Sequence, residues 1–251
     1  MDSCTLSTCS LDYTIYKYRP SLPANIVFLT VFSLSGLAHL LQLLLYNFRT
    51  TTFSVLIFIG CVTEVLGYAG RIWLYIDPFS FDAFVMQICC LTIAPAFYSA
   101  AIYLVIGYLV DAFGVRFSRL KPRMYAWIFI PCDILSLILQ AVGGALASAA
   151  VTGTADPKPG TNTMVAGLAF QVFTLLVFIV LLVDFAVRVR RGRVEEKGAP
   201  FGRGIKVFAG PFAVAVLFIF IRCVYRVAEL SEGWEGELIS EEPSFIALEC
   251  V

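Results

Sequence analysis

Charged and polar side chains recur at helical spacing inside long apolar stretches of this 251-residue sequence. Glu64, Tyr68 and Arg71 lie at positions i, i+4 and i+7, so in a helix they share one face. An ionisable side chain within a membrane span costs about 2.5–3.5 kcal/mol on insertion scales, which favours placing it inside the protein beside a partner. Such a group can bind an amine, bind an acidic headgroup or carry a proton.

Two further apolar stretches carry polar stripes whose spacing again places the side chains on one helical face. These stripes are Asp133, Ser136 and Gln140 in one stretch and Arg222, Tyr225, Arg226 and Glu229 in the other. Together the three stripes predict a polar interior that is richer toward the outer leaflet. The candidate substrate-binding or proton-binding residues are Glu64, Arg71, Asp133, Gln140, Arg222, Tyr225, Arg226 and Glu229. The secondary candidates are His39, Tyr68, Gln87 and Gln171.

Two interpretations of the buried charges are open. In one, the acidic and basic residues form an ion-pair network that fixes helix register and binds nothing. In the other, the same network coordinates the headgroup of an amphiphile or carries a proton, which the cost of burying unneeded charge favours. The two interpretations are compatible. The residues concerned are Glu64, Arg71, Asp133, Arg222 and Arg226.

The composition requires lipid as the solvent. Hydrophobic residues make up 59% of the chain and charged residues 14%, more apolar surface than a soluble core of this length can bury. A span needs about 20 mostly apolar residues, and six runs qualify. They are residues 24–46, 52–74, 84–110, 124–149, 164–187 and 207–228. We predict an all-α, polytopic transmembrane helix bundle, with residues 24–229 as one domain.

Proline and glycine residues within the spans affect how the helices bend and pack. Prolines remove backbone hydrogen bonds and favour kinks, and they occur at Pro95, Pro131 and Pro211. Glycines are expected to let neighbouring helices approach closely. These glycines are Gly36, Gly67, Gly143, Gly144 and Gly167.

The distribution of positive charge orients the bundle. Twelve of the 18 Lys and Arg residues lie in the segments 47–51, 111–123 and 188–206, which therefore face the cytosol. The N-terminal segment 1–23 is then extracellular, as is the acidic segment 230–251. Cys4 and Cys9, in the N-terminal segment, are either an oxidised pair or two free thiols.

Several kinds of catalytic and cofactor site are missing from the sequence. It contains no phosphate-binding loop of the Gly-x-x-x-x-Gly-Lys-Ser/Thr type, a single histidine, and no Gly-x-Ser-x-Gly nucleophile. The cysteines inside the spans are not spaced as a metal site. We therefore expect no enzyme, cofactor, metal or nucleic-acid partner.

The order and spacing of the polar and small residues resemble the fungal lipid-translocating exporter family, which is also called RTA-like. The resemblance covers most of the chain. It includes Tyr18-Arg19-Pro20-Ser21, Asn25, His39, Glu64, Gly67-Tyr68, Arg71, Gln87, Ala94-Pro95, Asp133, Ser136, Gln140, Gly143-Gly144, Gly167-Leu168, Gln171, Arg222, Tyr225-Arg226, Glu229, Gly233 and Gly236.

The resemblance implies a seven-helix protein of the plasma membrane or an internal membrane that exports amphiphiles such as sphingoid bases or sterol analogues, linked to stress response and drug resistance. Its alternatives are a lipid or small-molecule receptor, and haem or porphyrin uptake. Membrane lipids and an amphiphilic cargo are the expected partners. This chain has Gly107-Tyr108 where the family favours Gly-Arg, and only six residues follow Phe245. We expect the seventh span to be truncated, with an oligomer or partner helix filling its position.

Overall fold

The computed structural model describes residues 14, 16, 18–45, 51–152, 156, 158–195 and 203–231. The helices in these residues are α1 (Leu22–Leu45), α2 (Thr51–Ile76), α3 (Phe81–Phe113), α4 (Pro122–Thr152), α5 (Lys158–Glu195) and α6 (Arg203–Ser231), with a short 3-10 helix η2 (Val115–Phe117). No strand occurs in this part of the chain, so the all-α prediction is confirmed. Cys4, Cys9 and the predicted stub of a seventh span lie outside the described residues.

Each of the six helices is long and apolar enough to cross a membrane. The shortest has 24 residues, which at 1.5 Å per residue gives about 36 Å against a hydrocarbon core of about 30 Å. The chain is therefore an integral membrane protein built as a helical transmembrane bundle.

The end of α5 differs from the prediction. The distribution of positive charge predicts that Arg188, Arg190 and Arg191 lie in a cytosolic connection, whereas α5 continues through them to Glu195. Arginine has a high helix propensity, and basic side chains are stabilised near the C-terminal end of the helix dipole. The helix therefore continues beyond its apolar segment.

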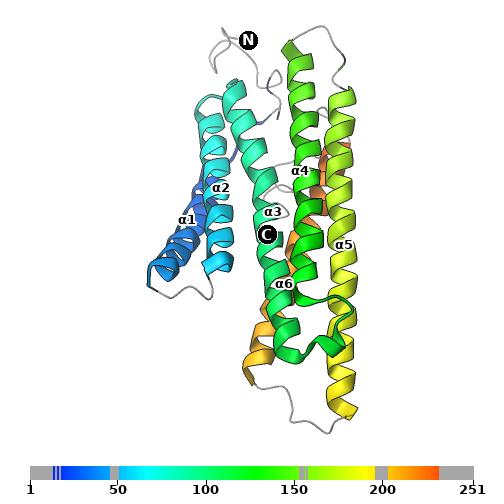
Figure 1. Cartoon of the computed structure of the whole chain (residues 1–251). Helices are drawn as coiled ribbons and strands as arrows, with labels where there is room; N and C mark the ends of the chain where they lie inside the picture. Colours follow the sequence, from blue (N-terminus) through cyan, green and yellow to red (C-terminus); the bar gives the residue numbers. More distant parts are fainter. Residues whose placement is uncertain are drawn as a thin grey trace.

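Consecutive helices pack against one another, and α3 also contacts α6. Figure 1 shows α3 between the α1–α2 pair on one side and the α4–α5 pair on the other, with α6 behind. The start of α3 is capped by the Ser80 hydroxyl, which accepts a hydrogen bond from the Ala83 N–H. Because α3 touches both halves of the bundle, its shape affects the whole interior.

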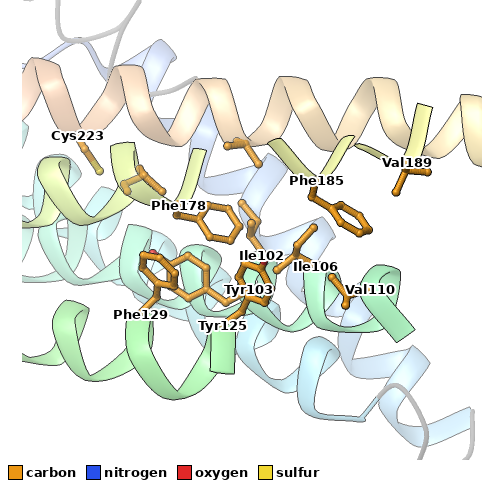
Figure 2. Close-up of a cluster of buried hydrophobic side chains, with 12 residues drawn as sticks. Ile102, Tyr103, Ile106, Val110, Tyr125, Phe129, Phe178, Phe185, Val189 and Cys223 are labelled. Atoms are coloured by element: carbon orange, nitrogen blue, oxygen red, sulfur yellow. The ribbon is translucent and has the colours of Figure 1, made fainter. Parts of the chain in front are cut away.

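An aromatic core fills the part of the bundle where α3 ends and α4 begins. The rings of Tyr103, Phe129 and Phe178 converge there from three helices, and the ring centroids of Tyr103 and Phe178 are 4.7 Å apart (Figure 2). Tyr125 adds a perpendicular ring against Phe178. Edge-to-face pairs of this kind are favourable beyond simple burial of area, so this half of the bundle is held mainly by apolar packing.

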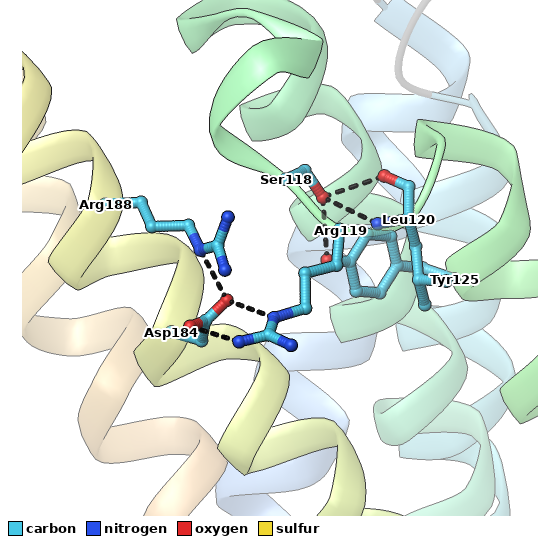
Figure 3. A network of polar contacts seen from close by, with 6 residues as sticks. All are labelled: Ser118, Arg119, Leu120, Tyr125, Asp184 and Arg188. Carbon is cyan, nitrogen blue, oxygen red and sulfur yellow. Dashed lines mark hydrogen bonds and ion pairs between the residues drawn. The ribbon is translucent and has the colours of Figure 1, made fainter.

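The connection between α3 and α4 is fastened to α5 by charge. Nε and Nη2 of Arg119 donate to the Asp184 carboxylate at 2.9 and 3.2 Å, and Nε of Arg188 donates to the same carboxylate at 2.8 Å (Figure 3). Beside them, the hydroxyls of Ser118 and Tyr125 lie 2.9 Å apart. These contacts place the basic end of α5 next to the basic connection at 111–123.

Close helix packing at the glycines is confirmed, with one exception. A Cβ at Gly143 would lie 2.4 Å from the Met164 backbone nitrogen, and one at Gly160 would lie 2.4 Å from the Ala147 nitrogen, so α4 and α5 touch backbone to backbone here. The closest atoms to a Cβ at the other three predicted positions are Cys61 Cβ for Gly36 (3.2 Å), Leu91 Cδ2 for Gly67 (2.6 Å) and Ser136 O for Gly167 (2.9 Å).

Gly144 is the exception. A Cβ there would meet no atom of the described residues within 4 Å, so in this part of the chain the prediction that this glycine allows close packing is wrong. In a helix, neighbouring residues point about 100° apart, and only Gly143 of this pair faces α5.

Candidate functional site

The polar stripes on α2, α4 and α6 are all buried, and none of their residues is more than 5% exposed. Their burial agrees with the helical spacing of the sequence. Because lipid offers no hydrogen bonds, the groups of these stripes need partners inside the protein.

Glu64 and Arg222 form the central ion pair of this interior. Nη1 of Arg222, on α6, lies 2.5 Å from Oε1 of Glu64, on α2, and both side chains are almost fully buried. Nη2 of the same guanidinium donates to the backbone oxygen of Leu91, on α3, at 3.0 Å. Pro95 lies four residues after Leu91 and has no N–H, so this oxygen lacks its usual helical donor. One arginine thereby joins three helices.

A second buried pair lies about one turn further along α6. Nη1 of Arg226 lies 3.0 Å from Oε2 of Glu229. Arg71, on α2, donates from Nη2 to the Tyr18 hydroxyl at 3.2 Å, and its guanidinium lies 5.7 Å from the centre of the Tyr16 ring. The charged side chains of α2 and α6 are thus tied both to each other and to the residues before α1.

Tyr16 and Tyr18 contact the candidate site but are not among the site residues predicted from the sequence. Nε2 of Gln87, on α3, donates to the Tyr16 hydroxyl at 2.9 Å, and burial raises the pKa of that hydroxyl, which therefore stays protonated. The signal available in the sequence was the presence of tyrosines beside the first span, a position where their amphipathic rings are common.

The third polar group joins α4 to α5. Nε2 of Gln140 donates to Oε1 of Gln171 at 3.0 Å. Oε1 of Gln140 is buried and accepts no hydrogen bond from the part of the chain that the structure describes. The Ser136 hydroxyl, one turn away, donates to the backbone oxygen of Asp133.

Asp133 is separate from these pairs. The residue is 4% exposed, and within the described residues neither carboxylate oxygen has a well-formed hydrogen bond. The Tyr103 hydroxyl, on α3, interacts with the carboxylate as a weak hydrogen-bond donor. The expectation of a single network that includes Asp133 is therefore wrong: helix rotation directs Glu64 to Arg222 and leaves Asp133 against α3. A buried carboxylate in this setting attracts a cation or a proton.

The remaining secondary candidates lie apart. His39, on α1, is partly buried with its ring edge toward Phe53, and its Nδ1 has no hydrogen-bond partner among the described residues. The Tyr68 ring stacks against the rings of Phe28 and Phe32, at centroid distances of 5.5 and 5.8 Å. Tyr68 thus helps to pack α1 on α2. In the described part of the chain, no group of three His, Cys, Asp or Glu side chains could hold a metal ion.

Comparisons with known proteins agree with this architecture. The sequence profile of the family described as RTA1 like protein matches residues 57–251. A sphingoid long-chain base transporter, RSB1, of Saccharomyces cerevisiae is 35% identical over 92% of this chain and 68% of its own length.

Two other relatives from the same yeast are 26% identical. Protein RTA1 aligns over 92% of this chain and 78% of its own length, and protoporphyrin uptake protein 1 over 94% and 87%. The relatives whose names state an activity are named for transport or uptake. No solved structure matches the chain significantly. Because the family profile covers most of the chain and the similarity to the transporter extends over nearly all of it, this protein belongs to the RTA1-like family.

Proposed function

We propose that this protein moves a sphingoid long-chain base, or a related amphiphile with one alkyl chain, across the membrane. The observation that carries the proposal is the 35% identity to a sphingoid long-chain base transporter over 92% of the chain. The 26% identity to protoporphyrin uptake protein 1 supports porphyrin uptake as a second candidate. We propose no catalytic step, because moving a lipid between leaflets breaks no bond.

The chemistry of the cargo fits the interior. A sphingoid base carries an ammonium group, and Asp133 supplies a buried carboxylate that no cationic side chain among the described residues neutralises, with the Tyr103 hydroxyl as its polar neighbour. Glu64 already holds Arg222, so an amine binding at Glu64 would have to displace a guanidinium. We therefore propose Asp133 as the group that receives the amine or a coupled proton, and the Glu64–Arg222 pair as the element that keeps the helices in place.

We further propose that the protein resides in the plasma membrane with its N-terminus outside. The contacts of Arg119 and Arg188 with Asp184 support this topology, since they gather the basic segments at one end of the bundle. An Arg190→Cys variant tests it, because Arg190 is exposed near the end of α5. A membrane-impermeant maleimide added to intact cells should leave this thiol unlabelled until the membrane is opened. Labelling in intact cells would contradict this topology and place the end of α5 outside the cell.

The transport proposal is tested by reconstitution in liposomes with labelled sphingosine. The full chain should move the label between leaflets with saturable kinetics, and Asp133→Asn should reduce the rate about tenfold, which corresponds to ~1.4 kcal/mol. Asp111→Asn is the matched control, since Asp111 is an exposed carboxylate at the end of α3, and it should transport like the unaltered chain.

Other outcomes contradict the proposal. Saturable binding of sphingosine without movement between leaflets would favour a receptor. Movement of protoporphyrin but not of sphingosine would favour the second candidate. Equal transport rates in Asp133→Asn and Asp111→Asn would show that Asp133 does not take part in transport.

A further inference from the structure

A cavity of about 800 Å³ lies between α3 and α4. Its two long walls run from Phe81 to Ile93 on α3 and from Ile134 to Ser148 on α4, and most of the lining side chains are apolar. The cavity is also lined by Thr14, Tyr16, Leu74, residues 78–80 and Met164. We refer to it as the α3–α4 groove. Its volume is in the range of about 300–1,000 Å³ that is usual for sites that hold small ligands.

The length of the groove suits one alkyl chain. At 1.5 Å per residue, the two walls extend about 18 and 21 Å along their helices, compared with about 15 Å for half of the hydrocarbon core. The groove is partly open, and several of its lining residues, including Ile134 and Ile138, are half exposed. A chain can therefore enter the groove sideways from the lipid.

Gly144 keeps the groove wide. It lines the groove, and a Cβ there would meet no atom of the described residues within 4 Å. A glycine inside a helix costs about 0.5–1 kcal/mol relative to alanine. Helix packing accounts for Gly143, whereas at Gly144 the missing side chain serves only to leave room.

Gln140 provides a polar contact on the groove wall. The side chain is 4% exposed and lines the groove, while its Nε2 is used by Gln171. Its Oε1 has no donor among the described residues. Leaving a buried acceptor unpaired costs about 1–3 kcal/mol, so this oxygen points to a ligand with an N–H or O–H group.

The charges of the lining residues narrow the chemical class of the ligand's headgroup. Among the residues that the structure describes, no Lys, Arg, Asp or Glu side chain lines the groove. A phosphate headgroup would find no counter-charge there. The hydroxyl groups or the unprotonated amine of an amino alcohol can donate to an acceptor such as Gln140.

We propose that the α3–α4 groove is a lateral binding site for an amphiphile with one alkyl chain and an amine or hydroxyl head. The chain lies along the apolar walls, and the head donates a hydrogen bond to Oε1 of Gln140. Asp133 lies seven residues before Gln140 on the same face of α4, about 10 Å deeper. The groove thus leads the head toward Asp133 while the chain stays at the lipid boundary. This inference rests on the proposed function and states where the cargo of that function binds.

Photocrosslinking tests the site directly. Sphingosine with a diazirine in its alkyl chain is added to the full-length protein in liposomes of phosphatidylcholine, and the labelled peptides are identified by mass spectrometry. The label should fall within residues 81–93 and 134–148, and unlabelled sphingosine should compete for it. Labelling confined to other helices would overturn the proposal, as would equal competition by a short-chain phosphatidylcholine.

Two variants test the role of the groove. Gly144→Phe fills it and should lower labelling and transport about tenfold. Val142→Phe is its control, because Val142 is exposed on the same helix outside the groove lining, and it should behave like the unaltered chain. Gln140→Leu should weaken labelling by sphingosine but not by a diazirine alkane without a head. Equal labelling by sphingosine in all three variants would overturn the proposal.

The folded state and the proposed function are monitored separately. Circular dichroism and a single elution peak show whether each variant is folded, and crosslinking of the unaltered chain decides the site even if Gly144→Phe does not fold. Transport by the unaltered chain without labelling in the groove would sink this inference alone. Labelling in the groove without transport would leave the binding site standing and sink the proposed function.

Discussion

Arg222 donates to the backbone oxygen of Leu91 at 3.0 Å. Pro95 occupies the position in α3 whose N–H would normally serve this oxygen. The same guanidinium holds Glu64. The proline on α3 leaves the Leu91 oxygen without its helical donor, and the arginine on α6 supplies a donor in its place. The two residues therefore act as a unit. In lipid, where no water can replace a lost donor, this arrangement explains how α3 tolerates an internal proline.

The relationship between Pro95 and Arg222 can be measured by a double-mutant cycle. Arg222→Met should destabilise the protein, because it removes the donor to Leu91 as well as the ion pair. The loss should be smaller when Pro95→Ala is also present, because the alanine N–H then serves the Leu91 oxygen. We expect a coupling of about 0.5–1.5 kcal/mol, measured by unfolding in detergent. Additive losses would mean that the proline and the arginine act independently.

Glu64→Gln should cost far more stability than the loss of an exposed ion pair. It leaves the buried Arg222 guanidinium with a neutral partner, and removing one member of a buried pair typically costs about 3–5 kcal/mol. Arg119→Ala is the comparison, because Arg119 is well exposed where it meets Asp184, and such pairs contribute about 0–1 kcal/mol. Unfolding in detergent measures both. Similar losses for the two variants would show that the interior pair is well hydrated.

Alanine substitutions at the two neighbouring glycines should have opposite effects. Gly143→Ala brings a methyl group to 2.4 Å from the Met164 nitrogen, so α4 and α5 must move apart, at a cost of about 1–3 kcal/mol. Gly144→Ala meets no atom within 4 Å and should stabilise the helix by about 0.5–1 kcal/mol. Thermal unfolding of the two purified variants compares them. A loss of stability at Gly144 would show that another segment packs there.

Tyr16→Phe should loosen the segment before α1 from α3. It removes the acceptor of the Gln87 amide and leaves that buried group unsatisfied, at about 1–3 kcal/mol. Tyr108→Phe is the matched control, because Tyr108 is 53% exposed on α3, the helix that carries Gln87. Limited proteolysis near residue 20 should become faster only in Tyr16→Phe. Equal rates in the two variants would contradict a fastening role for the Tyr16 hydroxyl.

The sequence by itself determined the six helices and the burial of their polar stripes. Both follow from local periodicity: an apolar run of sufficient length must be helical in lipid, and polar residues at i, i+4 and i+7 must then share an inward face. It also indicated where helices touch, at Gly143 and Gly167, because small residues permit close approach.

Only the tertiary structure decided which polar groups meet. The pairing of Glu64 with Arg222 spans 158 positions of sequence, and the separation of Asp133 from that pair depends on how each helix is rotated about its axis. Gly143 and Gly144 look alike in the sequence, yet one contacts α5 and the other leaves room in the α3–α4 groove. Periodicity fixes the face of a helix that turns inward. Which side chain that face meets on a neighbouring helix depends on the rotation of each helix about its axis and on its depth in the membrane. Both arise from the packing of all six helices together.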